Sequence, residues 1–185
     1  MTLPVRGNVL IAPPQMLDSR FEQAVILLTH RDLDGSWGLV LNRPSGTTTQ
    51  ELFSRANIEC ELDIELYWGG PVNPGIIWML HDDSWSMDNT VEIEQGWSMT
   101  SNPAMFKKLK QEGFPKHWRL FYGFAGWAAE QLEGEIKGSR PWDKNHSWLW
   151  AQSLGPAWAF DIESEQLWEN SLQLSGQQAV SNWLV

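Results

Sequence analysis

The apolar residues of this chain occur in short runs that predict strands separated by turns. Runs of branched aliphatic and aromatic residues, some alternating with polar residues, are typical of strands that pack on a core. Glycine, proline, asparagine and aspartate lie between many of the runs, as turns require. The pattern predicts strands over residues 9–11, 24–29, 37–41, 64–68, 75–80, 90–94, 118–122 and 147–150.

Helix signals interrupt this series at four places. A capping threonine opens residues 48–55, and Ser101-Asn102-Pro103 places a capping residue before a proline suited to the first helical turn. Ala128, Leu132 and Ile136 recur at intervals of four and predict a buried helical stripe. The predicted helices span residues 48–55, 104–112, 127–137 and 162–172.

The order of these elements predicts an α+β fold. Hairpins and scattered helices replace regular βαβ alternation, so we expect a largely antiparallel sheet. With 185 residues and 42% hydrophobic content, the chain can bury one sizeable core, which predicts a single domain over residues 1–185. Tryptophan occurs 13 times, and we expect these large side chains to serve core and interface packing more than ligand stacking.

Two glycine-containing segments, residues 69–71 and 123–126, are predicted to be turns where the backbone bends sharply or approaches other backbone closely. If both turns meet on one side of the sheet, their amides and the neighbouring Asn42 and Arg43 would line a small cleft suited to an anion. The candidate cleft consists of Asn42, Arg43, Gly69, Gly70, Pro71, Gly126, Trp127, Gln131 and Glu135.

Several motifs follow one another along the chain: Gly-Asn-Val-Leu-Ile-Ala-Pro at 7–13, Gly-Leu-Val-Leu-Asn-Arg-Pro at 38–44, Gly-Gly-Pro-Val at 69–72, and Arg-Leu-Phe-Tyr-Gly-Phe-Ala-Gly-Trp at 119–127. Together they resemble the AlgH/YqgE family of small bacterial proteins. The resemblance implies a curled, bifurcated sheet that forms a pseudo-barrel with helices packed outside, and a role in transcriptional regulation has been ascribed to the family. Phe124 and Ala129 stand where the family usually has tyrosine and glycine.

The charge balance argues against direct contact with nucleic acid. Thirteen Lys and Arg residues against 23 Asp and Glu residues give a formal net charge of −10. Affinity for nucleic acid comes largely from neutralising phosphates, which an acidic surface opposes. The densest basic group, residues 107–110, lies on a predicted helix and is expected to be a solvated face.

The sequence also bounds the compartment. No apolar run approaches the roughly 20 residues that a membrane-spanning helix needs. The first residues show no secretion signal, and the single cysteine, Cys60, excludes an internal disulfide. We therefore expect a cytoplasmic protein without a membrane contact, in which Cys60 is an incidental thiol.

Motifs for common cofactors are absent from the sequence. It contains no HExxH, paired CxxC, phosphate-binding GxxxxGK[ST], GxGxxG or GxSxG pattern, so no metal site and no cofactor are predicted. Residues 30–35 begin like a calcium loop, but Leu41 stands where a bidentate glutamate is needed, which favours a hairpin turn. The group His81-Asp82-Asp83 is expected to be exposed loop polarity rather than a cation site.

Glu130, Glu133 and Glu135 form the most serious catalytic candidate. Glutamates near a helix start complement the helix dipole, and Glu130 is explained by that alone. Trp127, Gln131 and Glu135 recur at intervals of four and would share one helical face. A desolvated glutamate beside an indole is a candidate general acid, although a lone carboxylate without a partner base is weak evidence.

Three functions remain open from the sequence. The leading hypothesis is a non-enzymatic binding or regulatory protein that acts through an unknown protein partner or small ligand, and affects transcription indirectly. The alternative is an enzyme of unknown class, such as a hydrolase, with a site near Asn42, Arg43 and residues 130–135. The third is a transcription factor that binds DNA directly, which the charge disfavours.

Overall fold

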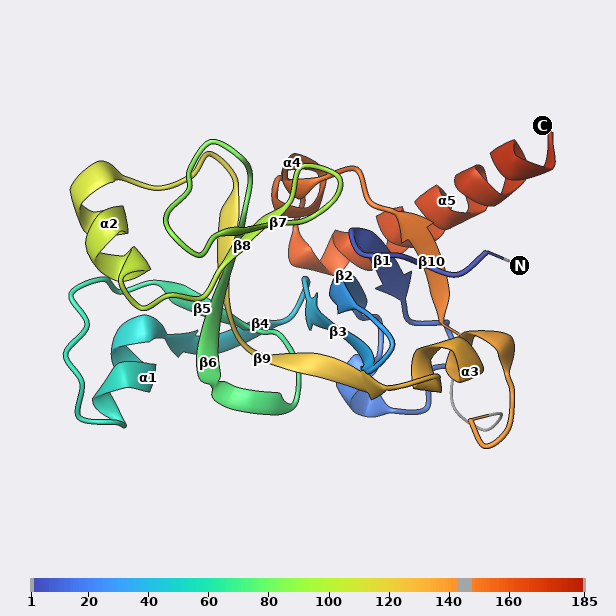
Figure 1. Ribbon diagram of the computed structural model, residues 1–185, viewed down its shortest axis with the longest axis horizontal. Helices are drawn as coiled ribbons and strands as arrows, with labels where there is room; N and C mark the ends of the chain where they lie inside the picture. Colours follow the sequence, from blue (N-terminus) through green and yellow to red (C-terminus); the bar gives the residue numbers. More distant parts are fainter. Residues whose placement is uncertain (1, 143–147, 185) are drawn as a thin grey trace.

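A computed structural model describes residues 2–142 and 148–184, whose strands form one curled ten-stranded sheet (Figure 1). Its main path runs β10-β1-β2-β3-β9-β6-β8-β7, and β4 joins through β5, which pairs with β9. The strands are β1 (Asn8–Ile11), β2 (Val25–Arg31), β3 (Gly35–Val40), β4 (Pro44–Thr48), β5 (Glu65–Trp68), β6 (Val72–His81), β7 (Val91–Glu92), β8 (Ser98–Thr100), β9 (Trp118–Ala128) and β10 (Leu149–Gln152).

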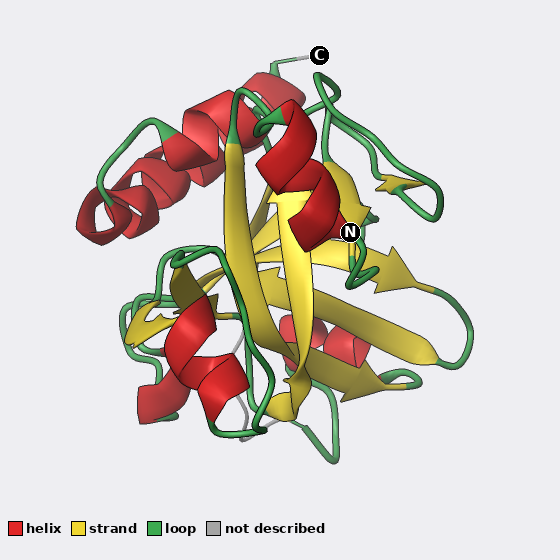
Figure 2. Cartoon of the chain, turned by 90° about the vertical axis from the view of Figure 1, so that its left-hand side faces the viewer, coloured by secondary structure: helices red, strands yellow, loops and turns green. Residues whose placement is uncertain are grey.

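Helices pack on the outside of the curled sheet, as Figure 2 shows. Every pairing among the described strands is antiparallel except that of β5 with β9. The predicted α+β class with a largely antiparallel, curled sheet is therefore confirmed. The helices are η1 (Ser19–Phe21, a 3₁₀ turn), α1 (Thr49–Ser54), α2 (Met105–Glu112), α3 (Gln131–Lys137), α4 (Pro156–Phe160) and α5 (Ser164–Trp183).

The sheet divides on its longest strand, β9. The first half of β9, residues 118–122, lies between β5 and β6, whereas residues 125–128 pair with β3. Gly69, which follows β5, bridges the fork: its amide donates to the Tyr122 carbonyl oxygen at 2.9 Å, and its carbonyl oxygen accepts from the Val40 amide at 2.9 Å. The segment that connects β5 to β6 must pass over β9, because these two strands lie on opposite sides of it. It can do so only where neither backbone carries a side chain at the contact.

Glycines occupy this crossing. A methyl group on Gly70 would overlap the backbone of Phe124 and Ala125, and one on Gly123 would overlap the carbonyl oxygen of Gly70. Gly123 has a φ of +67° and Gly70 a φ of +151°, values that favour glycine. The predicted close backbone approach of the two glycine segments is thus confirmed.

Apolar layers cover both faces of the central strands. Leu27 and its face of β2 pack in a cluster with Leu167 of α5, whereas Ile26 and the opposite face pack in a cluster with Leu132 of α3. Residues 24–28 are an unbroken apolar run because both faces of this strand are buried.

The sequence predicts a turn at residues 123–126 and a helix from Trp127, and both predictions are wrong. β9 continues through this segment to Ala128, and α3 begins only at Gln131. Opposite Gly123 the extra residues lie on β6, where the register shifts between Val72 and Ile77, and pairing with β3 holds the residues after Gly123 extended. Tertiary pairing overrides the local turn signal here.

Other boundaries also differ from the sequence prediction. Neither β4 nor α4 was predicted, and the predicted strand at 90–94 is only the two-residue β7. α5 extends to Trp183, well past the predicted end at residue 172. The start of the predicted strand at 147 lies outside the described residues, while its remainder overlaps β10 at residues 149–150.

His81 is fully buried, so the prediction of exposed loop polarity at this residue is wrong. Its Nδ1 lies 2.7 Å from the Asp82 carbonyl oxygen and donates to it, because that oxygen only accepts. Its Nε2 then accepts from the Thr100 hydroxyl at 2.9 Å in the neutral tautomer. Burial lowers the pKa of His81, since the charged ring would lose its hydration.

Replacing Gly70 with alanine is expected to destabilise the fold by about 3 kcal/mol or more, because backbone on both sides of the crossing must shift. The matched control is Gly75→Ala, since no atom lies within 4 Å of the position its methyl group would take. Urea unfolding measures both free energies. Equal stability of the two variants would contradict the steric role of the crossing.

The depressed pKa of His81 predicts that the folded protein loses stability as the pH falls below about 6.5, the ordinary histidine pKa. Above that pH both states hold His81 neutral; below it the unfolded state binds the proton first. The loss reaches at most about 1.4 kcal/mol per pH unit and ends below the folded-state pKa. Unfolding free energies between pH 7 and 5 should fall less steeply for His81→Gln, and identical slopes would refute the assignment.

Candidate ligand-binding site

The end of β9 and the start of α3 place three of the predicted residues, Trp127, Gln131 and Glu135, around one cavity. Glu130 takes a left-handed conformation with a φ of +65°, which turns the chain from strand to helix. The Gln131 side chain then accepts from the Ala128 amide at 3.0 Å and donates to Glu135 Oε1 at 2.9 Å, one helical turn later. Glu135 is thereby directed back toward the strand end.

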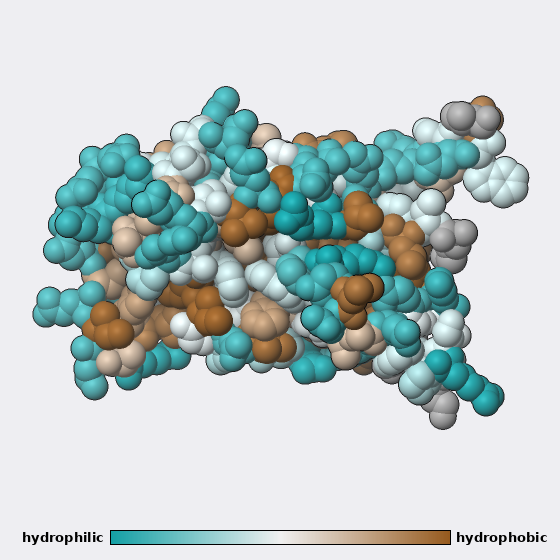
Figure 3. Space-filling view, viewed as in Figure 1, coloured by the Kyte–Doolittle hydropathy of each residue, from teal (hydrophilic) through white to brown (hydrophobic). Residues whose placement is uncertain are grey.

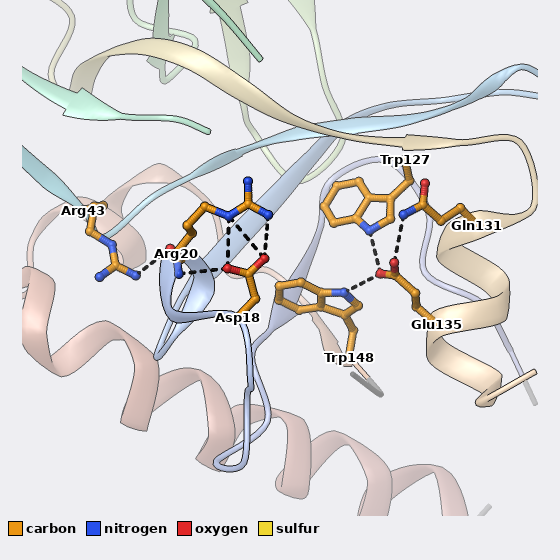
Figure 4. A network of polar contacts seen from close by, with 7 residues as sticks. All are labelled: Asp18, Arg20, Arg43, Trp127, Gln131, Glu135 and Trp148. Atoms are coloured by element: carbon orange, nitrogen blue, oxygen red, sulfur yellow. Dashed lines mark hydrogen bonds and ion pairs between the residues drawn. The ribbon is translucent and has the colours of Figure 1, made fainter. Parts of the chain in front are cut away.

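The Glu135 carboxyl group is buried, with 6% of the residue exposed. Its Oε2 accepts hydrogen bonds from the indole nitrogens of Trp127 and Trp148, both at 2.9 Å. With the bond from Gln131, three N–H donors converge on this one group (Figure 4). Trp148 comes from the segment before β10, so Glu135 connects three separate parts of the chain.

A cavity of about 370 Å³ lies beside this network. The rings of Trp127 and Trp148 meet edge to face, with centroids 6.0 Å apart, and Phe21 meets Trp148 in the same way at 5.9 Å. The lining residues are Asp18, Arg20, Phe21, Pro71, Val72, Ala125, Gly126, Trp127, Gln131, Glu135 and Trp148.

An ion pair lies across the cavity from Glu135. Arg20 donates from Nη2 to Asp18 at 2.7 Å and from Nε to the same carboxylate at 3.0 and 3.2 Å (Figure 4). The hydrogen bond and negative charge of Asp18 raise the pKa of Arg20, which keeps it charged. The third guanidinium nitrogen of Arg20 points away from Asp18 in Figure 4.

Of the residues predicted to line a cleft, Pro71, Gly126, Trp127, Gln131 and Glu135 all line this cavity. The other four lie outside its lining. The predicted exposed amide of Gly69 is not available to an anion, because it donates to Tyr122.

Asn42 and Arg43 support the structure behind the cavity. Asn42 accepts from the Val25 amide at 3.0 Å and donates to the Gln23 carbonyl oxygen at 2.9 Å. Arg43 donates to the carbonyl oxygens of Arg20 and Glu22 at 3.2 and 2.8 Å. Arg43 therefore fixes the backbone of the turn that carries Arg20.

Comparison with known proteins shows the family to which the chain belongs. The model of the AlgH-like family matches residues 9–180. The chain belongs to the AlgH-like family. UPF0301 proteins from Shewanella frigidimarina and Paraburkholderia phytofirmans are 29% and 32% identical to it, and the matches cover 93% and 92% of this chain and 91% and 88% of theirs.

Solved structures agree with this AlgH-like assignment. The solution structure of AlgH from Pseudomonas aeruginosa superimposes with a TM-score of 0.72 at 29% identity, covering 94% of this chain and 93% of that one. A crystal structure of a Corynebacterium diphtheriae protein matches with a TM-score of 0.66 at 24% identity, covering 89% and 85%, which shows the fold alone.

Sequence reasoning misses six lining residues of this AlgH-like site: Asp18, Arg20, Phe21, Val72, Ala125 and Trp148. Asp18 caps the short 3₁₀ turn by accepting from the Arg20 amide at 3.0 Å, a local signal that the sequence offers. Trp148 has no such signal, because nothing near it in sequence marks it among the other tryptophans.

Across residues 2–142 and 148–184, no three histidine, cysteine, aspartate or glutamate side chains gather closely enough to hold a metal ion. In the same residues, no helix combines the length and apolar character that crossing a membrane requires.

The substitution Glu135→Gln is expected to destabilise the AlgH-like fold by about 1–3 kcal/mol, because an amide NH₂ would face one of the three N–H donors. In NMR spectra the indole N–H signals of Trp127 and Trp148 should both move. Glu130→Gln, at an exposed residue before α3, is the control and should leave them in place. Unmoved indole signals in Glu135→Gln would contradict the network.

Proposed function

We propose that this AlgH-like protein is a non-enzymatic binding protein of the cytoplasm, whose indole-walled cavity takes a small ligand. We further propose that it affects transcription through a protein partner rather than through DNA. The observation that carries the proposal is the environment of Glu135, the buried carboxyl group of the cavity.

The contacts of Glu135 favour binding over catalysis. A carboxylate offers about four acceptor positions, and three are taken by N–H groups of the protein itself. A general acid or base must exchange a proton with substrate within hydrogen-bond distance. Glu135 instead holds two indoles and an amide in fixed positions, which prepares the walls of a pocket before a ligand arrives.

The enzyme alternative requires Asn42, Arg43 and the glutamates of residues 130–135 to share one pocket. Asn42 and Arg43 are engaged with backbone groups behind the cavity, and Glu133 pairs with Arg31. None of these three side chains is therefore a partner base for Glu135.

The cavity chemistry indicates the kind of ligand. A volume of about 370 Å³ lies at the lower end of the range for ligand pockets. Aromatic edges on one side suit a flat ring system on the ligand. On the other side, the third nitrogen of Arg20 suits a hydrogen-bond acceptor on that ligand (Figure 4).

The charge of the chain supports an indirect route to regulation over direct contact with DNA. The net charge of −10 opposes contact with phosphates. The densest basic group is further neutralised, since Lys108 pairs with Glu112 and Lys110 with Glu61. The single cysteine, Cys60, is consistent with a reducing compartment.

A retention experiment tests the ligand-binding proposal. The purified chain is equilibrated with a bacterial small-molecule extract, washed and denatured, and the released compounds are identified by mass spectrometry. We expect a compound with a flat ring system whose affinity falls about tenfold or more in Arg20→Ala, through loss of a charged hydrogen bond. Arg6→Ala is the control, because Arg6 is also a partly exposed arginine paired with an acid, Glu94, outside the cavity lining.

Three outcomes would overturn parts of this proposal. Equal retention of the compound by Arg20→Ala and the native chain would show that the compound does not bind in this cavity. Turnover of a compound that Glu135→Gln abolishes would show an enzyme. A gel shift with duplex DNA at low salt would show direct DNA binding.

A further inference from the structure

The second half of α5 differs from the rest of this acidic chain because it carries no charge. Residues 170–185 contain no aspartate, glutamate, lysine, arginine or histidine, whereas the whole chain has 23 acidic and 13 basic residues. In Figure 1 this part of α5 extends beyond the sheet, and in Figure 3 it forms the upper right end of the molecule, where hydrophilic and apolar residues mix.

The outward side of this helix forms one stripe. Gln173, Gly176, Gln177, Val180 and Leu184 recur at intervals of three and four, the spacing of one helical face. The apolar members are open to solvent: Val180 is 61% and Leu184 83% exposed. Beside them, Trp183 is 91% exposed.

Gly176 lies in the middle of the stripe, and nothing in its own chain requires a glycine there. No atom lies within 4 Å of the position that a methyl group would take, and its φ is not in the left-handed region. Glycine weakens a helix interior, so its presence at an exposed position is unexplained by the single chain. A second helix that packs closely on this face would explain it.

The inward side of α5 is fixed to the edge of the sheet. The Gln178 side chain accepts from the Gln152 amide at 2.8 Å and donates to its carbonyl oxygen at 2.9 Å. The Ser175 hydroxyl donates to the Trp150 carbonyl oxygen at 3.1 Å. These bonds occupy the outer edge of β10, which obstructs association of two copies through that strand. These hydrogen bonds hold α5 in place, so that its opposite side faces solvent.

We propose that this stripe is the contact surface for a second copy of the same chain. Two chains of net charge −10 repel each other wherever charged surfaces meet, so the uncharged end of α5 is where they can approach. A two-fold axis near Val180 pairs the helices antiparallel and sets Leu184 of the partner subunit over Gly176. The pairing is isologous, and every residue of the stripe from Gly176 to Leu184 meets an uncharged residue.

The size of the contact determines its strength. The paired part of the stripe, residues 176–184, covers about two and a half helical turns, which makes the interface smaller than those of stable complexes. The dimer therefore forms in proportion to protein concentration, and a single charge in its centre is enough to disrupt it.

Sedimentation velocity on the full chain over a range of concentrations tests the proposal. We expect a monomer–dimer equilibrium for the native chain, and a dimer dissociation constant raised about tenfold or more in Val180→Glu. Asn182→Glu is the matched control: it adds the same charge at an exposed residue two positions away, on the opposite side of the helix, and should leave the equilibrium unchanged.

Two further variants separate the contact from a purely structural role of the helix. Gly176→Leu should raise the thermal midpoint of the dilute monomer and still weaken the dimer, because it stabilises the helix but fills the space for Leu184 of the partner subunit. Val180→Cys in a Cys60→Ser background should form an intersubunit disulfide on mild oxidation, whereas Asn182→Cys should not. A native chain that stays monomeric at millimolar concentration, or equal dimerisation by Val180→Glu and Asn182→Glu, would overturn the proposal.

Discussion

The close backbone contact between Gly69-Gly70 and Gly123 is the constraint on which this structure depends. A sheet can divide only if one strand changes neighbours along its length, and β9 does so between Tyr122 and Ala125. The chain leaving β5 must then pass over β9 at backbone distance, since a side chain on Gly70 would overlap the strand. The crossing therefore lies at the point where β9 exchanges β5 and β6 for β3 as its neighbours.

The cavity is a consequence of the same crossing. Because β9 stays extended past the fork, Trp127 lies at the strand end, and α3 begins close enough for Gln131 to bond back to Ala128. Pro71 and Val72 line the other side of the same cavity because they follow directly after the crossing glycines. Thus the fork that shapes the fold also brings the cavity walls together.

The sequence predicts the features that depend on residues close together in the chain better than the features that depend on contacts between distant residues. The helix cap at Thr48 is formed within four residues, and α1 begins where predicted. The grouping of Trp127, Gln131 and Glu135 was predicted from helical spacing and is observed, although Trp127 belongs to a strand and reaches Glu135 through its indole. Trp148 joins the same group only through the fold, so no spacing in the sequence marks it.

The same distinction explains the turn that proved to be a strand. Gly123 has the left-handed conformation expected of a turn, but the glycines it contacts are more than fifty positions away in the sequence, and pairing with β3 keeps the chain straight. A glycine-rich segment therefore indicates that another part of the backbone packs closely against it, but it does not indicate which part of the chain that is.

Glu135 shows how a polar group can specify such a packing arrangement. Burying a carboxyl group is unfavourable unless its hydrogen bonds are made, so the network is satisfied only when β9, α3 and the segment before β10 are all in place. Apolar contacts alone would tolerate small shifts of the two indoles, whereas two N–H groups that converge on one oxygen do not. The carboxyl group thus sets the position of the aromatic walls, and with it the shape of the space that they enclose.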